Sequence, residues 1–317
     1  MLTKIVDDFG TGYVHTTVVH TVTDGFFWVR SSGIDRPLPI GALPDRIRPL
    51  LASIQGPVTF QPHQAVHTHE TWRVFPAPGP SSVAKQLLLQ EEGTSGTADL
   101  LQSAGAALAE LHAHVVPGPP VLPSPQGPAR LTRWLGGSAR HRASGRLREE
   151  AVRFLGESRM RTARLWCADL QGENVRLSGV LLHGAPGLGL LIPSVEPGTG
   201  GSSAVLLTGE ELTTGPAEFD LGWIAGELVE HREVSAGDSQ EQQSLINALL
   251  TGYGATADLD AVARTAVLRM FVHVHDFATY VGWHESVRTH LALLADAIDA
   301  ADSALLKQPL RPKDRRP

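Results

Sequence analysis

The sequence predicts a two-lobed α/β (α+β) fold, in which a small β-rich front part precedes a mainly helical rear part. Residues 13–31 are rich in β-branched and aromatic types, with an Asp-Gly pair between two such runs, which predicts a β-hairpin. Residues 97–114 carry apolar side chains at helical spacing and predict an amphipathic helix. The proline-rich residues 115–128 cannot be helical, and they separate the two parts.

The predicted boundary lies within this proline-rich stretch. We expect a β-rich lobe over 1–115, whose last helix leads into the second lobe, and a helical lobe over 116–306. A chain of 317 residues with 42% hydrophobic residues can build two sizeable cores. Residues 307–317 are polar and broken by prolines, so we expect a disordered tail.

Hydrophobic periodicity predicts the remaining elements. Residues 42–54 have one apolar face and predict a helix, whereas 66–75 and 82–89 are predicted as strands joined by a Pro/Gly loop. In the rear part we expect helices over 147–155, 219–231, 239–250, 259–280 and 284–306.

Composition excludes several classes of protein. The chain has 27 Lys+Arg against 33 Asp+Glu, a net charge of -6, so an overall basic nucleic-acid binder is not indicated. No apolar run is long enough for a membrane-spanning helix, and the N-terminus lacks the apolar core of a signal peptide. The single cysteine excludes an internal disulfide framework. We therefore expect a cytoplasmic protein without membrane or nucleic-acid partners.

Charge is unevenly distributed along the chain. Residues 130–164 contain ten Arg and three Glu, whereas residues 196–260 contain twelve acidic residues and one Arg. The simpler interpretation is a pair of solvated faces that attract each other. The alternative is that the acidic segment concentrates a cationic substrate and that the Arg-rich segment 130–164 docks an anionic partner protein.

Lysine is scarce, and its positions are informative. The chain has four lysines, and Lys85 is the one that lies away from the termini. An edge-strand lysine that discourages strand pairing is the simpler interpretation. Because Arg and Lys differ in pKa, hydration and geometry, a lysine kept in an Arg-dominated chain favours a functional role.

Residues 166–177, WCADLQGENVRL, place Asp169 and Asn174 five residues apart in an expected loop before a short strand. Phosphoryl transfer needs such a pair, a carboxylate that orients the acceptor hydroxyl and an amide oxygen that holds Mg2+ beside it. Ordinary loop capping by Asp and Asn is the alternative.

Four short patterns occur in a recognisable order. They are V-A-K at 83–85, A-L-A-E-L-H at 107–112, C-x-D-L-x-x-x-N at 167–174 and F-D-L-x-W at 219–223. In this order the chain resembles the aminoglycoside phosphotransferase and choline kinase group of kinase-like enzymes, over roughly residues 66–295. Each pattern alone is weak, and the ordered set is moderately specific.

The resemblance implies a protein kinase-like fold with an atypically small N-lobe, and ATP and Mg2+ as cofactors. It also implies roles for individual residues. Asp169 would be the catalytic base, Asn174 a Mg2+ ligand, Lys85 the lysine on the nucleotide phosphates and Asp220 a structural acid that opens the following helix.

The sequence also departs from the group's pattern, which reads H-G-D-L-H-x-x-N in the catalytic loop and I-D-W-E further on. Cys-Ala replaces His-Gly before the expected Asp, and alignment on Glu196 puts Ser194 at the metal-binding Asp. Because a hydroxyl is a poor substitute for a carboxylate on Mg2+, Glu196 would have to take over as metal ligand. Glu91 and Glu92 are candidate partners of Lys85 at the nucleotide.

Two functions of different classes follow from these features. The first is an ATP/Mg-dependent phosphotransferase, a kinase that phosphorylates a hydroxyl of a small natural product or of a peptide Ser/Thr. The second is a catalytically degenerate pseudokinase, a binding or scaffold subunit whose partner protein would contact the Arg-rich segment 130–164.

Overall fold

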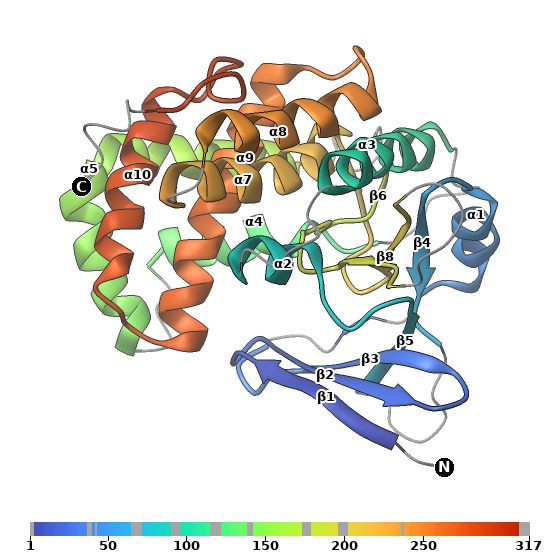
Figure 1. Cartoon of the computed structure of the whole chain (residues 1–317). Helices are drawn as coiled ribbons and strands as arrows, with labels where there is room; N and C mark the ends of the chain where they lie inside the picture. Colours follow the sequence, from blue (N-terminus) through green and yellow to red (C-terminus); the bar gives the residue numbers. More distant parts are fainter. Residues whose placement is uncertain are drawn as a thin grey trace.

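The computed structural model describes residues 3–36, 40–41, 43–64, 72–89, 96–114, 122–137, 142–172, 179–195, 202–235 and 238–310. Figure 1 shows a small sheet set apart from a larger helical body, with helix α2 drawn between them. Within the described residues, no helix has the length and apolar character needed to cross a membrane.

The front sheet has four antiparallel strands in the order β1-β2-β3-β5. The predicted hairpin is confirmed, since β2 and β3 pair from Val14↔Ser32 to Thr21↔Gly25, and Gly25 adopts the positive φ (79°) that the turn requires. The strands are β1 (Thr3–Gly10), β2 (Val14–Thr21), β3 (Gly25–Ser32) and β5 (Trp72–Ala77).

The helical body surrounds α7, which packs against α8 and α9 and is buried along most of its length. The predicted helices 97–114, 219–231, 239–250, 259–280 and 284–306 are confirmed with shifted boundaries, whereas the predicted helix 147–155 is part of a much longer helix and α4 was not predicted. The helices are α3 (Thr97–Ala113), α4 (Gln126–Leu135), α5 (Arg142–Gln171), α7 (Glu218–Val234), α8 (Ser239–Tyr253), α9 (Leu259–Asp276), the π-helix η3 (Phe277–Val281) and α10 (Ser286–Asp299).

Two small sheets lie between the front sheet and the helices. In the first, β4 pairs in parallel with β8, which pairs antiparallel with β7, and in the second β6 pairs with β9. The helical turn before β4 buries its apolar face, as predicted for residues 42–54. These elements are η1 (Asp45–Ile47), α1 (Arg48–Ser53), β4 (Val58–Pro62), β6 (Val180–Leu182), β7 (Leu191–Pro193), β8 (Ala204–Thr208) and β9 (Thr213–Gly215).

A second, smaller core joins the front sheet to the rest of the molecule. It consists of five buried residues, which we call the interlobe cluster: Val18, Trp28, Phe75, Ile192 and Leu207. The first three come from adjacent strands of the front sheet and the last two from β7 and β8. The two lobes therefore meet through packed side chains rather than through solvent.

Three local predictions were wrong. Residues 126–128, which were expected to be non-helical, form the start of α4, because a proline is tolerated in the first turn of a helix, where its missing N–H would have no partner. Lys85 lies on helix α2 (Val83–Leu89) and not on a strand, because the short run 82–89 carries apolar residues that fit either period. Asp169 lies inside the last turns of α5 and not in a loop, because residues 142–171 are rich in strong helix formers.

Candidate functional site

The candidate site is built around one buried carboxylate, that of Asp220 in the first turn of α7. Its Oδ2 accepts hydrogen bonds from the backbone N–H of His183 (2.7 Å) and lies 3.1 Å from His112 Nε2. Its Oδ1 accepts from the backbone N–H of Gly184 (2.9 Å). Asp220 thus fixes the loop that leaves β6, and its predicted role as a structural acid at the start of a helix agrees with this geometry.

The loop between β6 and β7 runs His-Gly-Ala-Pro-Gly-Leu-Gly-Leu over residues 183–190. Gly184 has φ +90°, and a Cβ there would lie 1.8 Å from the carbonyl oxygen of Glu211, so this position requires glycine. His183 is buried, and its Nε2 lies 3.0 Å from the carbonyl oxygen of Leu207. The loop is therefore fixed by its backbone at Gly184 and by the side chain of His183.

The loop 183–190 aligns with the pattern H-G-D-L-H-x-x-N through its first two residues. His183 and Gly184 occupy the first two positions, but Ala185 stands where the pattern has Asp and Leu190 where it has Asn. The side chain of Ala185 has no group that could orient a hydroxyl, and the side chain of Leu190 has no oxygen for a metal ion.

The second pattern, I-D-W-E, aligns with the end of β8 through its last residue. Leu207, Thr208, Gly209 and Glu210 stand in its four positions, so that Thr208 replaces the carboxylate. Thr208 is fully buried, and its hydroxyl donates to the carbonyl oxygen of Leu206 (2.7 Å). The Asn and the Asp of the two patterns are thus both replaced, and Glu210 is the one carboxylate that the aligned residues keep. The described residues contain no cluster of three or more His, Cys, Asp or Glu side chains suited to a metal ion.

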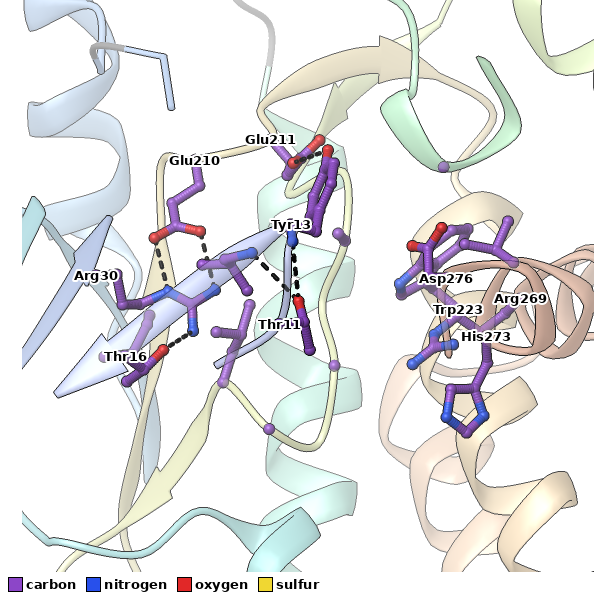
Figure 2. Close-up of a pocket in the computed structure, with 18 of the residues that line it drawn as sticks. Thr11, Tyr13, Thr16, Arg30, Glu210, Glu211, Trp223, Arg269, His273 and Asp276 are labelled. Atoms are coloured by element: carbon purple, nitrogen blue, oxygen red, sulfur yellow. Dashed lines mark hydrogen bonds and ion pairs between the residues drawn. The ribbon is translucent and has the colours of Figure 1, made fainter. Parts of the chain in front are cut away.

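Kinase-like enzymes carry a lysine on their third strand, and Arg30 is the cationic residue of β3 in this chain. Its Nε and Nη2 donate to the two carboxylate oxygens of Glu210 at 2.7 and 3.1 Å, and its Nη1 donates to Thr16. Figure 2 shows Arg30 held between Glu210 and Thr16 on one wall of the pocket. Burial alone would raise the pKa of Glu210, but the Arg30 guanidinium lowers it, so the pair is ionised.

The turn between β1 and β2 contains Gly10-Thr11-Gly12, followed by Tyr13. Glycine turns of this kind cover the phosphates in kinase-like enzymes. Here the turn is fastened to the helical lobe, because Gly12 N–H donates to the carbonyl oxygen of Tyr280 (3.0 Å). The Tyr13 hydroxyl donates to Glu211 (3.3 Å) and accepts from Arg130 on α4.

Arg130 connects this turn to α9. Its guanidinium carbon lies 4.0 Å from the centroid of the Tyr13 ring, and its Nη2 lies 2.7 Å from Asp276 Oδ2. Burial would raise the pKa of Asp276, but the charges of Arg130 and His275 hold it well below its ordinary value. Tyr13, Arg130 and Asp276, which we call the turn lock, therefore join the front turn to two helices of the rear lobe.

A cavity of about 450 Å³ lies between the front turn, the loop 183–190 and the helical lobe. Its size is typical of small-molecule sites. Figure 2 shows Trp223, Arg269, His273 and Asp276 on the helices that form the wall opposite Arg30. Its four arginines are each paired with a carboxylate of the same lining: Arg30 with Glu210, Arg36 with Glu211, Arg130 with Asp276 and Arg269 with Glu227.

Three of the site residues predicted from sequence are described by the structure, and they are not brought together at this pocket. Lys85 Nζ pairs with Asp7 of β1 at 2.8 Å, and Asp169 is exposed on α5; neither lines the pocket. Ser194 follows β7, where its backbone N–H donates to the Ser203 carbonyl oxygen, and it does not line the pocket either.

The predicted residues Asn174, Glu196, Glu91 and Glu92 lie outside the described residues.

Sequence reasoning missed the residues that do line the pocket. The dipeptide His183-Gly184 was the available signal, since it precedes Asp220 by the distance that three short strands and their connections occupy. The glycine turn before Tyr13 was the second, because G-x-G between two strand-like runs fits a phosphate-covering turn.

The front antiparallel sheet, the helical lobe and the Asp220-anchored loop between them define a two-lobed kinase-like phosphotransferase fold, as predicted. The predicted resemblance to the aminoglycoside phosphotransferase and choline kinase group is confirmed for the fold by solved structures of such phosphotransferases.

The chain is similar to amicoumacin kinase in complex with AMP-PNP, Ca2+ and Ami, with a TM-score of 0.58 and 14% identity over 98% of this chain and 90% of that chain. It is also similar to the GDP and kanamycin complex of APH(2")-IIia (TM-score 0.54, 12% identity, 95% and 93% of the two chains). The AMP-bound complex of spectinomycin phosphotransferase, APH(9)-Ia, gives a TM-score of 0.50 at 13% identity, with 95% and 93% covered. No protein-family model and no curated protein sequence matches the chain.

The buried His183 makes stability depend on pH. Burial lowers its pKa below the ordinary value of 6.5, so the unfolded chain takes up a proton at a higher pH than the folded chain. We expect His183 to contribute fully to the free energy of unfolding above about pH 6.5. Below that pH the free energy of unfolding should fall by up to ~1.4 kcal/mol per pH unit. Urea unfolding at pH 7.5, 6.5 and 5.5 measures the slope.

His183→Gln is the matched variant for this dependence. This variant removes the titrating group, so the free energy of unfolding should depend less steeply on pH. Burial also lowers the pKa values of His63 and His231, so these two residues should keep part of the pH dependence. An unchanged slope in His183→Gln would contradict the assignment.

Proposed function

We propose that this chain keeps the kinase-like phosphotransferase fold as a binding site for a small molecule, without transferring a phosphoryl group. The observation that carries the proposal is Ala185. The loop that Asp220 anchors is in place, yet the side chain that would orient an acceptor hydroxyl is a methyl group.

The metal positions support the same proposal. Leu190 and Thr208 replace the amide and carboxylate ligands, and Glu210 gives both of its oxygens to Arg30. ATP with Mg2+ therefore lacks the oxygen ligands that would hold the ion at these positions. The degenerate pseudokinase, one of the two functions expected from the sequence, is the one that this geometry favours.

The chemistry of the pocket restricts the ligand. Four Arg–carboxylate pairs line it, so the four arginines and four carboxylates sum to no net charge. A cationic ligand would have to displace an arginine from its carboxylate, which leaves a partly buried guanidinium unpaired. We therefore favour a polar ligand without net charge, of the size of a small natural product.

A phosphotransferase is the second candidate, and the fold favours it. The similar solved structures are named as kinases or phosphotransferases, and their complexes contain AMP-PNP, GDP or AMP. On this alternative the protein would phosphorylate a hydroxyl of a small natural product with ATP and Mg2+.

A transfer assay separates the two candidates. The wild-type chain is incubated with γ-labelled ATP, Mg2+ and a panel of hydroxylated natural products and Ser/Thr peptides, with an active phosphotransferase as the assay control. We expect no label on any acceptor. Mg2+-dependent labelling of an acceptor would overturn the proposal.

A thermal-shift screen of the same natural products tests the binding site. Gly189 lines the pocket, and a Cβ there meets no atom within 4 Å, so Gly189→Leu should fill the pocket without straining the loop. Gly145 on α5 has equally open space and lies outside the pocket lining, so Gly145→Leu is the matched control. The thermal shift caused by a ligand should be lost in Gly189→Leu and kept in Gly145→Leu. A shift that persists in both variants would contradict binding at this pocket.

A further inference from the structure

Trp28 occupies a central position in the seam between the lobes. Its side chain is buried (2% exposed) in the interlobe cluster, with Val18 and Phe75 directly opposite it on the neighbouring strands. Ile192 and Leu207 complete the cluster from the rear. A side chain of this size leaves little free volume at the seam.

The indole also makes one directed contact. Its Nε1–H donates to the carbonyl oxygen of Gly79 at 3.0 Å. Gly79 belongs to the segment 78–82, which links β5 of the front sheet to α2 and which we call the linker. The linker itself is fixed against β7, since a Cβ on Gly79 would lie 2.3 Å from the Pro193 carbonyl oxygen.

Trp28 lies on the same face of β3 as Arg30 and nearer to the linker. The two residues are two apart on β3, so both face the cleft. Trp28 pairs with Phe75 and Arg30 with Arg73, and β5 runs from Arg73 towards the linker, so Trp28 is the nearer of the two to the linker.

In a kinase-like cleft the glycine turn and the β3 cation meet the phosphates. A nucleotide placed with its phosphates at the turn and at Arg30 would extend its base along β3, into the place that the indole fills.

We propose that Trp28 is a built-in substitute for the nucleotide base: its planar ring fills the base end of the cleft and its N–H makes the linker hydrogen bond that a base amino group would make. This inference rests on the proposed function and deepens it. On this proposal the Trp28 side chain blocks nucleotide binding. The pocket beside it then binds its small-molecule ligand without a nucleotide.

The cavity and the indole are contiguous. Leu207 belongs to the interlobe cluster and also lines the pocket, and Phe9, another lining residue, packs edge-on against the indole with ring centroids 6.2 Å apart. Removal of the indole should therefore open a space that connects with the pocket, wide enough for a base with its ribose projecting into the cavity.

Three variants test the proposal. Trp28→Ala removes the indole, and Trp28→Val is the milder change, because valine suits a strand and leaves a smaller hole. Trp134→Ala is the matched control. Trp134 is equally buried, and its Nε1 also donates to a carbonyl oxygen, that of Ser144, but it lies inside the helical lobe.

Melting temperatures are measured with and without adenosine, and ATP binding is measured by calorimetry. We expect no response of the wild type to adenosine or ATP. Adenosine should raise the melting temperature of Trp28→Ala, and to a smaller extent of Trp28→Val, in a saturable manner. Trp134→Ala should be destabilised but should not respond.

Three results would overturn the inference: nucleotide or adenosine binding by the wild type, folded Trp28 variants that ignore adenosine, or an equal response of Trp134→Ala. Where Trp28→Ala does not fold, the milder variant Trp28→Val carries the test. Nucleotide binding by the wild type without phosphoryl transfer would overturn this inference and leave the proposed function standing, whereas labelled acceptor would overturn both.

Discussion

Replacement of Asp220 by alanine is expected to lower the free energy of unfolding by about 3–5 kcal/mol, because it removes a fully buried carboxylate that accepts from two backbone N–H groups and contacts His112. The two N–H groups, those of His183 and Gly184, would be left buried without an acceptor. Chemical unfolding monitored by far-UV circular dichroism measures the loss.

The conservative variant Asp220→Asn should be nearly as damaging. Both carboxylate oxygens accept from N–H donors, whereas an amide offers one oxygen and one NH2 group. Whichever way the amide is turned, a donor would face a backbone donor.

Asp258→Ala is the matched control. Asp258 also accepts from two backbone N–H groups, those of Asp260 and Ala261 at 3.0 and 3.2 Å, but it caps α9 at the surface. Its loss should cost about 1 kcal/mol. Equal losses in Asp220→Ala and Asp258→Ala would show that Asp220 does not organise the loop.

The hairpin and the long helices were predictable because their determinants are local. The Asp-Gly turn fixes β2 and β3, and the apolar spacing in α3 and α9 matches the helical period over many residues. Lys85 was misplaced because seven residues of α2 are too few for the two periods to be distinguished.

The candidate site was misplaced for a different reason. A search for the catalytic pattern looks for its Asp and Asn, and these are the residues that the loop 183–190 has lost. Asp169 satisfied the search by chance, although the helix formers around it indicated helix. What identifies the loop is its contact with Asp220, a long-range hydrogen bond that no local pattern encodes.

The Arg-rich segment 130–164 shows how pairing limits an argument from charge. Arg148 and Arg164 donate to backbone carbonyl oxygens at the end of α4, and Arg159 pairs with Asp299. Much of the positive charge is therefore used within the fold, but these partners lie outside the acidic segment 196–260, so they do not decide between the two interpretations. Docking of a partner protein to this segment stays a prediction.

Breaking the turn lock should have the second-largest effect. Arg130→Ala is expected to cost about 3 kcal/mol, since it leaves Asp276 as a partly buried carboxylate without its guanidinium and removes the cation from the face of Tyr13. A double-mutant cycle of Arg130→Ala and Asp276→Ala should give a coupling energy above about 1 kcal/mol. Hydrogen exchange at residues 11–14 should accelerate in both single variants, because the front turn loses its attachment to the helical lobe.

Arg159→Ala is the matched control for this experiment. Arg159 and Asp299 also form a bidentate pair, with a shortest N–O distance of 2.6 Å, but their side chains are 35% and 58% exposed, against 8% for Arg130 and 24% for Asp276. Water screens the exposed pair, so its loss should cost less than about 1 kcal/mol and leave exchange in the front turn unchanged. A comparable cost for the two arginines, or unchanged exchange at residues 11–14 in Arg130→Ala, would mean that the turn is held by its backbone hydrogen bond to Tyr280 and not by the turn lock.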